Sequence, residues 1–257
     1  MGRYDLTDFE WSIIQPLLPN KPRGVPRVDD RRVLNGIFWV LRTGAPWRDL
    51  PQYYGPYTTC YNRFNRWRKA GVWERLMDAI VAAYDGNVQM IDSSSVRVHQ
   101  HAAGAKKGAE NRCMGRSRGG LTTKIHTLVD AKGLPFRFLL TPGQSHDATA
   151  AQILLQELWP DSFVLADKAY DADWIRACIE AQEAVPIIPD RSNRNESHAF
   201  SPLLYRLRNQ IERFFNKIKH FRRIATRYEK LAANYLAMIQ LAATRIWLRH
   251  QDNESTT

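Results

Sequence analysis

The region from about residue 88 to residue 188 switches its hydrophobic period several times, and this pattern restricts the possible folds more than any other feature of the chain. A period of two residues indicates a strand, and a period of about 3.6 residues indicates a helix. Three strand-like segments come first, the second and third forming a hairpin, and a helix, a strand, a helix and a strand follow. In chain order, the seven segments lie at 88–98, 123–130, 135–141, 147–158, 163–166, 172–181 and 185–188. This order predicts an α/β core in which helices flank a mixed sheet.

The residues before this core have the pattern of a separate helical module. Short segments with helical spacing are separated by turns rich in proline and glycine. They lie at 7–18, 29–43 and 58–70, and a fourth begins near Val72. Short helices with tight connections are typical of helix-turn-helix DNA-binding modules. We therefore expect an N-terminal all-α, helix-turn-helix-like domain over residues 1–86 and a second domain, with the C-terminal helices, over residues 87–257.

The third predicted helix carries basic side chains interleaved with aromatic ones. Such side chains can bind phosphates or guanine edges when a helix enters a DNA groove. The candidate DNA-binding residues are Arg63, Arg66, Arg68 and Lys69. The alternative is a solvated basic face, with Phe64 and Trp67 packed in the core.

The distribution of charge favours a polyanionic partner. The chain has 37 Lys and Arg against 26 Asp and Glu, a formal net charge of +11 at pH 7. The excess lies in residues 1–87 and 201–257, whereas the segment between them is balanced. A positive field on both flanks is expected of a protein that binds double-stranded DNA, although net charge also serves solubility.

The three cysteines are far apart and form no C-x-x-C pair, which argues against a disulfide framework and against a cysteine-based zinc site. The longest apolar-rich stretch, 231–248, is interrupted by polar residues and by Arg245. We therefore expect no export signal and no membrane partner, and a cytoplasmic, nucleoid-associated protein.

Two aspartates lie where an apolar core does not normally tolerate a charge. Asp92 interrupts the first apolar strand, and Asp167 directly follows the apolar run at 163–166. A carboxylate in such a place has to be hydrogen-bonded or bound to a metal, because an isolated buried charge is too costly. Together the two would form half of a site for a hard cation such as Mg²⁺, which prefers oxygen ligands. The alternatives are local, since Asp92 could cap a turn and Asp167 could cap the next helix.

A strongly helical segment near the end of the chain supplies a third acid. In YRLRNQIERFFNKIKHFRR, which starts at Tyr205, helical spacing places Arg208, Glu212 and Lys219 on one narrow face beside an apolar stripe. Glu212 could complete the metal site while Arg208 and Lys219 bind DNA phosphates. It could also form an ordinary surface ion pair with Arg208.

The spacing of Tyr205, Arg208, Glu212 and Lys219 resembles the signature of bacterial insertion-sequence transposases of the family four and five superfamily. Four longer strings are similar to family five members, so that the resemblance covers nearly the whole chain. They are GRSRGGLTTKIHTLVDAKG, TPGQSHD, LADKAYD and IERFFNKIKHFRRIATRYEKLAANY. The N-terminal segment also resembles the short helical domain of that family.

The resemblance implies a ribonuclease-H-like catalytic core in which Asp92, Asp167 and Glu212 form a DDE triad and bind the metal. Tyr205, Arg208 and Lys219 would then take supporting, DNA-binding roles. It further implies cleavage and strand transfer at the ends of an insertion sequence, with two Mg²⁺ ions as cofactors and Mn²⁺ as a possible substitute. The partners would be double-stranded DNA, as terminal inverted repeats and as target, and at least a second copy of the chain, because two ends must be joined.

Two other classes of function remain open. A non-catalytic DNA-binding protein derived from a transposase, such as a repressor, would share the basic features without needing three convergent acids. A structure-specific nuclease with the same core would cut without strand transfer. The histidines between residues 99 and 146 match no zinc pattern, and the serines at 93–95 lack a nucleophile elbow. An amphipathic helix at 231–249 is expected to cover the sheet, with a dimer contact as the alternative.

Overall fold

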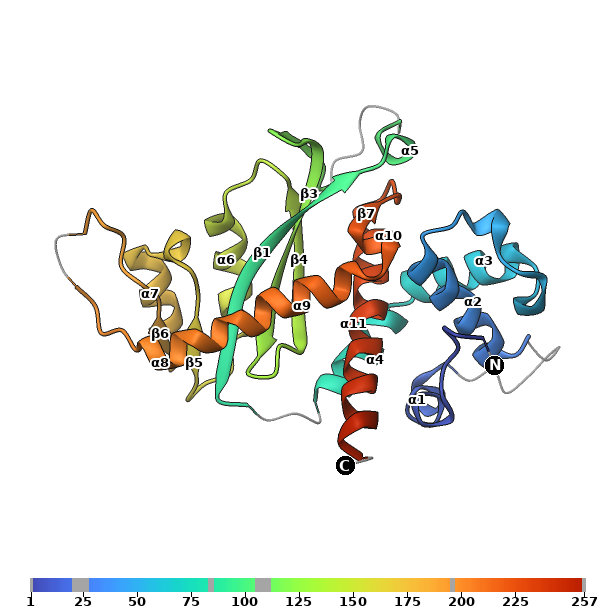
Figure 1. Ribbon diagram of the computed structural model, residues 1–257, viewed down its shortest axis with the longest axis horizontal. Helices are drawn as coiled ribbons and strands as arrows, with labels where there is room; N and C mark the ends of the chain where they lie inside the picture. Colours follow the sequence, from blue (N-terminus) through green and yellow to red (C-terminus); the bar gives the residue numbers. More distant parts are fainter. Residues whose placement is uncertain (1, 20–27, 83–85, 105–111, 195–196, 256–257) are drawn as a thin grey trace. The chain divides into compact units, whose positions relative to one another are not determined.

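The computed structural model describes residues 2–19, 28–82, 86–104, 112–194 and 197–255 (Figure 1). The chain divides into two compact units. Unit 1 consists of Met1–Ala83 together with Ile218–Thr257, and unit 2 consists of Tyr84–Lys217.

Unit 2 has the layered α/β structure that the hydrophobic pattern predicts. Its strands are β1 (Val88–Val98), β2 (Gly115–Ser117), β3 (Gly120–Asp130), β4 (Pro135–Pro142), β5 (Phe163–Leu165) and β6 (Val185–Ile187). Its α-helices are α5 (Gln100–Ala103), α6 (Asp147–Leu154), α7 (Asp173–Glu180), α8 (Pro202–Tyr205) and α9 (Asn209–Lys219), whose last two residues belong to unit 1. Three short 3₁₀ turns complete it, η4 (Leu155–Glu157), η5 (Lys168–Tyr170) and η6 (Arg206–Arg208).

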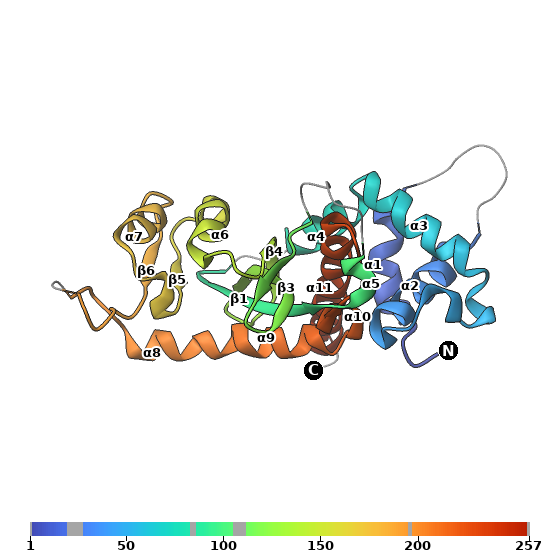
Figure 2. The ribbon, with the colours of Figure 1, turned by 90° about the horizontal axis from the view of Figure 1, so that it is seen from above.

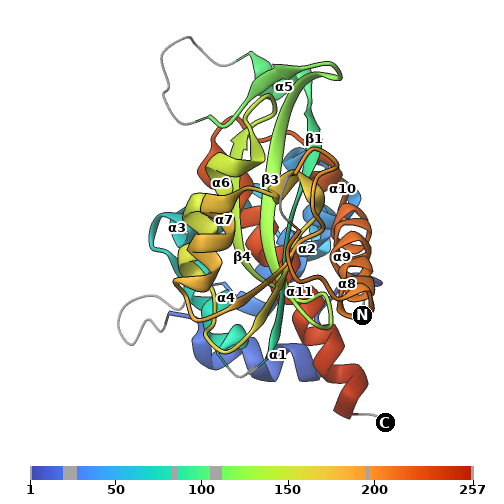
Figure 3. The same ribbon diagram turned by 90° about the vertical axis from the view of Figure 1, so that its left-hand side faces the viewer.

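The sheet of unit 2 is mixed. Strands β4, β3 and β1 are antiparallel neighbours, β2 pairs with β3, and β1, β5 and β6 are parallel neighbours. Figures 2 and 3 show α6 and α7 on one side of this sheet and α8 and α9 on the other. A buried apolar stripe of α9 that includes Ile211, Phe214 and Phe215 lies on the sheet side, and the Phe214 and Phe138 ring centroids are 6.0 Å apart.

The predicted fold class, a ribonuclease-H-like mixed sheet with flanking helices, is confirmed. Each predicted strand begins and ends within three residues of the observed strand. The main difference lies at 205–223, where the pattern predicts one continuous helix. The structure instead has α8, the 3₁₀ turn η6 and α9, and Ser201 caps the first of these by accepting a hydrogen bond from the Leu204 amide. The short elements β2 and η5 carry too few residues for a periodic pattern and were not predicted.

Unit 1 is helical, apart from the short strand β7. Its elements are α1 (Asp8–Ile14), η1 (Gln15–Leu17), α2 (Asp30–Thr43), η2 (Trp47–Asp49), η3 (Gln52–Tyr54), α3 (Tyr57–Lys69), α4 (Val72–Val81), α10 (Arg222–Ala225), β7 (Thr226–Arg227) and α11 (Ala232–Ser255). The N-terminal helical segment is therefore confirmed as helical. Among the described helices, none combines the length and the apolar character that crossing a membrane requires.

The C-terminal helix α11 packs within unit 1 against α1, α3 and α4. A buried ion pair fixes this packing. Arg245 donates to both carboxylate oxygens of Glu10, from Nε to Oε1 at 3.1 Å and from a terminal nitrogen to Oε2 at 3.0 Å. The compact units therefore divide the chain differently from the predicted domains. The prediction assigns residues 87–257 to one domain, whereas residues 218–257 belong to unit 1. The sequence does not indicate this grouping, since Glu10 and Arg245 are 235 positions apart.

Candidate active site

The register of two parallel strands brings Asp92 and Asp167 to the same level of the sheet. β1 and β5 pair with Met90 opposite Leu165. Asp92 and Asp167 each lie two residues beyond this pair, towards the carboxyl ends of their strands. Because side chains alternate along a strand with a period of two, residues at equal offsets in register face the same side.

Asp92 lies within β1, opposite Thr127 of β3, and only 17% of its side chain is exposed. One carboxylate oxygen accepts a hydrogen bond from the Ser93 amide at 2.7 Å, and the other accepts one from Arg208 at 2.7 Å. Burial raises the pKa of Asp92 to about 6, the Arg208 charge and the Ser93 amide oppose this rise, and Asp167 and Asp147 add to it. Asp92 is thus a carboxylate that needs a cation beside it.

Asp167 has the local role that the sequence offers as an alternative, and one of its oxygens is left over. As the cap of η5 it accepts a hydrogen bond through Oδ1 from the Ala169 amide at 2.7 Å. Its Oδ2 lies 4.0 Å from a terminal nitrogen of Arg208. A helix cap and a ligand role are compatible here, since they use different oxygens.

Arg208 contacts the third acid as well. Its NH1 group donates to Glu212 Oε1 at 2.9 Å, one helical turn further along, so that a single guanidinium reaches Asp92, Asp167 and Glu212. Burial alone would lower the pKa of Arg208, but the carboxylates of Asp92, Asp167 and Glu212 raise it. The predicted ion pair between Glu212 and Arg208 is present, and the same guanidinium also joins both aspartates.

The two remaining residues of the spacing motif differ in their surroundings. Burial raises the pKa of Tyr205, and the charges of Arg208, Asp167, Asp92 and Glu212 also act on its phenol. Tyr205 is therefore near the acids. Lys219 lies two turns after Glu212, in the part of α9 that belongs to unit 1, and burial lowers its pKa.

A second polar cluster lies next to Asp92 in the chain and was not predicted. Ser93 donates to Asp147 Oδ1 at 2.9 Å, and Lys124 Nζ donates to the same oxygen at 2.9 Å. His126, opposite Ser93 in the sheet, is buried, and burial lowers its pKa to about 4, so that it is neutral at physiological pH. Asp147 begins α6, as the sequence indicates, but its link to β1 depends on strand register and has no local signal.

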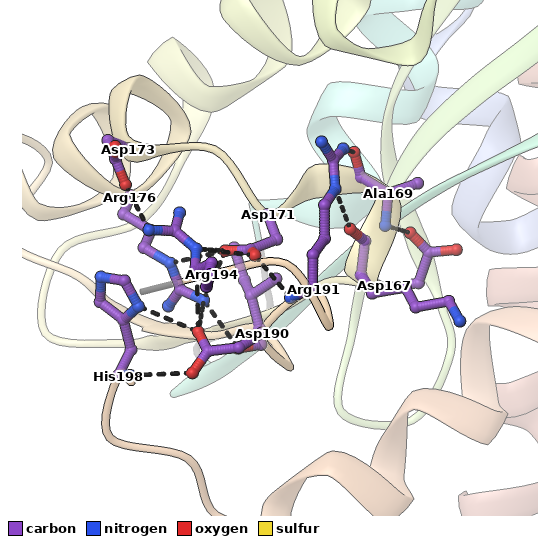
Figure 4. Close-up of polar contacts among 11 residues, drawn as sticks. Asp167, Ala169, Asp171, Asp173, Arg176, Asp190, Arg191, Arg194 and His198 are labelled. Atoms are coloured by element: carbon purple, nitrogen blue, oxygen red, sulfur yellow. Dashed lines mark hydrogen bonds and ion pairs between the residues drawn. The ribbon is translucent and has the colours of Figure 1, made fainter. Parts of the chain in front are cut away.

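A third group, Asp171, Asp190 and His198, has ligand atoms within 4.8 Å of one another, the only such group of three among the described residues (Figure 4). Its carboxylates are already bound to arginines. Asp171 accepts from Arg176 at 2.9 Å and from Arg194 at 2.8 Å, and these hydrogen bonds lower its pKa although burial would raise it. The group is thus a salt-bridged network, and a metal would have to displace two guanidinium groups.

The donor chemistry of the three acids around Arg208 fits a divalent ion better. Asp92, Asp167 and Glu212 offer carboxylate oxygens to one shared cation, now a guanidinium, and their side chains are 17%, 34% and 55% exposed. Oxygen ligands at a half-open site suit Mg²⁺ or Mn²⁺, which retain waters and bind through a few carboxylates.

The predicted DNA-binding residues of α3 separate into two sets. Arg66 and Lys69 are exposed and Arg68 is half-buried. Arg63 is buried, pairs with Asp30 of α2 and lies over the Trp67 ring, 5.0 Å from its centroid. Arg63 is therefore not available as the predicted DNA contact, because its guanidinium already pairs with Asp30 and lies against Trp67 inside the unit. Phe64 and Trp67 are packed in the core, as expected if this helix presents a solvated basic face.

Two family models match the chain. One, described as "Putative transposase of IS4/5 family", matches residues 6–77, and the other, described as "Transposase DDE domain", matches residues 83–247. The protein named "Putative transposase for insertion sequence element IS6501" from Brucella ovis is 44% identical over 130 residues, which cover 50% of this chain and 100% of that protein. The "Insertion element IS402 uncharacterized 16.2 kDa protein" from Burkholderia cepacia is 39% identical over 122 residues, 42% of this chain and 82% of that protein.

Among solved structures, the piggyBac transposase in its synaptic complex with hairpin DNA is similar with a TM-score of 0.54 at 10% identity. The match covers 96% of this chain and 72% of that chain. At this identity the similarity concerns the fold alone.

The raised pKa of Asp92 leads to a stability prediction. In the folded protein this carboxyl holds its proton up to about pH 6, against an ordinary value of 3.8, so that its ionised form opposes folding above pH 6 and the penalty disappears as the pH falls towards 4. The difference corresponds to at most about 3 kcal/mol. We expect Asp92→Asn to raise the free energy of unfolding of the metal-free protein by roughly 1 to 3 kcal/mol near pH 7.5 and by much less near pH 4.

Denaturant titrations at the two pH values measure this effect. Glu212→Gln is the matched control, because it removes an exposed carboxylate from the same guanidinium and should change stability by less than about 1 kcal/mol. A destabilising Asp92→Asn substitution near pH 7.5 would contradict the electrostatic description of the site.

Proposed function

This chain belongs to the family of insertion-sequence DDE transposases, and on that premise we propose that it catalyses Mg²⁺-dependent cleavage and strand transfer at the ends of its own element. The observation that carries the proposal is the meeting of Asp92, Asp167 and Glu212 at one guanidinium, from a strand, a strand end and a helix. Three carboxylates gathered this closely repel one another unless a positive charge lies between them. A shared cation is the chemical reason for such an arrangement.

Asp92, Asp167 and Glu212 would hold the metal ions. When bound, two Mg²⁺ ions would activate the attacking oxygen and stabilise the leaving 3′ oxygen. In the first step water attacks a phosphodiester at the element end, and the P–O bond to the 3′ oxygen breaks to leave a free 3′-OH. In the second step this hydroxyl attacks a phosphorus of the target DNA and displaces the target's own 3′ oxygen. Neither step needs a covalent protein intermediate.

The neighbouring residues of this chain would position the DNA. Arg208 presents a planar fork of donors that binds phosphate oxygens as well as carboxylates. Tyr205, near the same acids, and Lys219, two turns along α9, would add donors to the DNA backbone. Because positioning and charge stabilisation supply most of the rate in phosphoryl transfer, these residues matter for the reaction as well as for binding.

The proposed partners are double-stranded DNA, as element ends and as target, and a second copy of the chain. We propose that residues 1–86 bind the terminal inverted repeats, that residues 87–257 carry the catalytic reaction, and that the protein acts on DNA in the bacterial cytoplasm. The piggyBac transposase, which shares this fold, is seen in a synaptic complex with hairpin DNA, and this supports DNA as the substrate class.

Removing any one acid tests the catalytic assignment. We expect Asp92→Ala, Asp167→Ala and Glu212→Ala each to lower the cleavage rate by at least about a hundredfold while DNA-end binding is kept, because the loss acts on transition-state charge. The assay incubates the full chain with a labelled element end in Mg²⁺, Mn²⁺ or EDTA and separates products on a denaturing gel.

Glu157→Ala is the matched control for this test, since the Glu157 side chain is 52% exposed and pairs with Arg137 on the surface, as Glu212 at 55% pairs with Arg208. Mg²⁺-dependent cleavage retained by any of the three acid variants would refute the triad. A wild-type chain that shifts the labelled DNA and never nicks it would instead indicate the repressor function, and cutting without joined products would indicate a nuclease.

The exposed basic residues of α3 test the DNA-binding role of the N-terminal segment. The double variant Arg66→Ala/Lys69→Ala should weaken end binding and lower the slope of log K against log salt by about two, because each lost phosphate contact removes about one released counterion. Fluorescence anisotropy between about 50 and 200 mM KCl measures the slope. Arg249→Ala, which removes a half-exposed arginine of α11, is the control. An unchanged slope in the double variant would exclude α3 as the phosphate-binding helix.

A further inference from the structure

The turn that carries Asp167 is the least supported part of the acid site. Asp92 lies within β1 and is paired with Thr127 of β3, and Glu212 is part of a helix. The pairing of β5 ends at Leu165, opposite Ile187 of β6, so that Asp167 already lies beyond the ladder. Something other than the sheet has to fix its carboxylate.

Arg191 contacts this turn at two successive peptide groups (Figure 4). Its Nε donates to the Lys168 carbonyl at 3.0 Å, and a terminal nitrogen donates to the Ala169 carbonyl at 2.7 Å. The main-chain amide of Arg191 also donates to Asp171 Oδ2 at 2.8 Å. The turn is therefore held from the segment after β6 by side chain and main chain of one residue.

The contact reaches Asp167 through a single peptide group. The Lys168 carbonyl and the Ala169 amide belong to the same planar peptide unit. Arg191 binds the oxygen of this unit, and the amide on its other side donates to Asp167 Oδ1 at 2.7 Å. A charged donor on the oxygen polarises the unit and strengthens the hydrogen bond that its amide makes. The guanidinium thus orients the Asp167 carboxylate through Oδ1, while Oδ2 faces the cation that the acids share, now Arg208 at 4.0 Å.

The segment that carries Arg191 is itself held in place by ion pairs and hydrogen bonds. Asp171, whose side chain is fully buried, binds Arg176 of α7 and Arg194, and Arg176 also donates to the Ile188 carbonyl at 2.9 Å. Asp190 accepts from the His198 amide at 2.9 Å. These contacts bind the segment before and after Arg191 to the rest of unit 2, so that the position of its guanidinium is determined by the fold.

We propose that Arg191 is a positioning residue for the acid site, which acts through the Lys168–Ala169 peptide to hold the Asp167 carboxylate in place for a divalent ion. The proposal rests on the proposed function in one respect, the role of Asp167 as a metal ligand. Mg²⁺ demands nearly ideal ligand geometry, and the groups that orient a metal's ligands affect its affinity, so that a displaced carboxylate lowers binding.

Electrostatics and positioning predict opposite results, which makes the proposal testable. Arg191→Ala removes a positive charge from the turn that carries Asp167. Because like charges repel, the variant should by electrostatics alone bind a cation more tightly. If Arg191 positions Asp167, the variant binds the cation more weakly. Arg191→Lys keeps the charge, but a single ammonium on a flexible stem cannot replace the planar fork at two successive carbonyls.

The experiment titrates the full chain with Mn²⁺ alone and follows free Mn²⁺ by electron paramagnetic resonance. We expect Arg191→Ala and Arg191→Lys to weaken Mn²⁺ binding roughly tenfold to a hundredfold. Hydrogen exchange in the peptide around residues 166–171 should become faster in both variants, because the Ala169 amide loses its restraint. Arg75→Ala should bind Mn²⁺ as the wild type does, since it removes an exposed arginine that likewise donates to a main-chain carbonyl, that of Ala70 in unit 1.

Wild-type Mn²⁺ affinity in Arg191→Ala would overturn the proposal. If that variant fails to fold, Arg191→Lys decides, and wild-type affinity there would overturn it equally. Asp167→Asn separates this failure from a failure of the proposed function. If Asp167→Asn loses Mn²⁺ binding and the Arg191 variants do not, Arg191 has no positioning role. If Asp167→Asn also keeps wild-type affinity, the assignment of Asp167 as a ligand is wrong.

Discussion

The guanidinium of Arg208 is the contact on which the acid site depends. It donates to Asp92 at 2.7 Å and to Glu212 at 2.9 Å and lies 4.0 Å from Asp167, and these acids come from three different elements. Three carboxylates gathered without a cation would repel one another, and burial would favour protonation of Asp92. Arg208 lowers the pKa of Asp92 against the effect of burial and holds the three carboxylates together, in the arrangement in which they can bind a divalent ion. Because it offers donors alone, it can also bind a phosphate.

Backbone geometry places the three acids next to this guanidinium. The parallel pairing of β1 and β5 places Asp92 and Asp167 at equal distances beyond Met90 and Leu165, and one helical turn joins Arg208 to Glu212. The site is costly for stability, as the raised pKa of Asp92 indicates. Such a cost is common where function needs charge in a partly buried place.

How much of this the sequence predicts depends on the range of each interaction. Local periodicity predicts the longer strands, most of the helices and the common face of Arg208 and Glu212, because those patterns repeat within a few residues. The hydrogen bonds from Arg191 to the turn after Asp167 leave no such pattern, since they join residues 22 and 23 positions apart in irregular segments. For the same reason the sequence places Arg63 on a DNA-binding face, although Asp30 of another helix draws it into the core. The grouping of α11 with the N-terminal helices likewise depends on distant residues.

The most direct test of the account is the location of Mn²⁺ by anomalous scattering in crystals of the full chain bound to an element end. The account predicts anomalous peaks whose first ligands are carboxylate oxygens of Asp92, Asp167 and Glu212, with the Arg208 guanidinium moved off them. Mn²⁺ bound instead at Asp171, Asp190 and His198, or bound without one of the three acids, would contradict it.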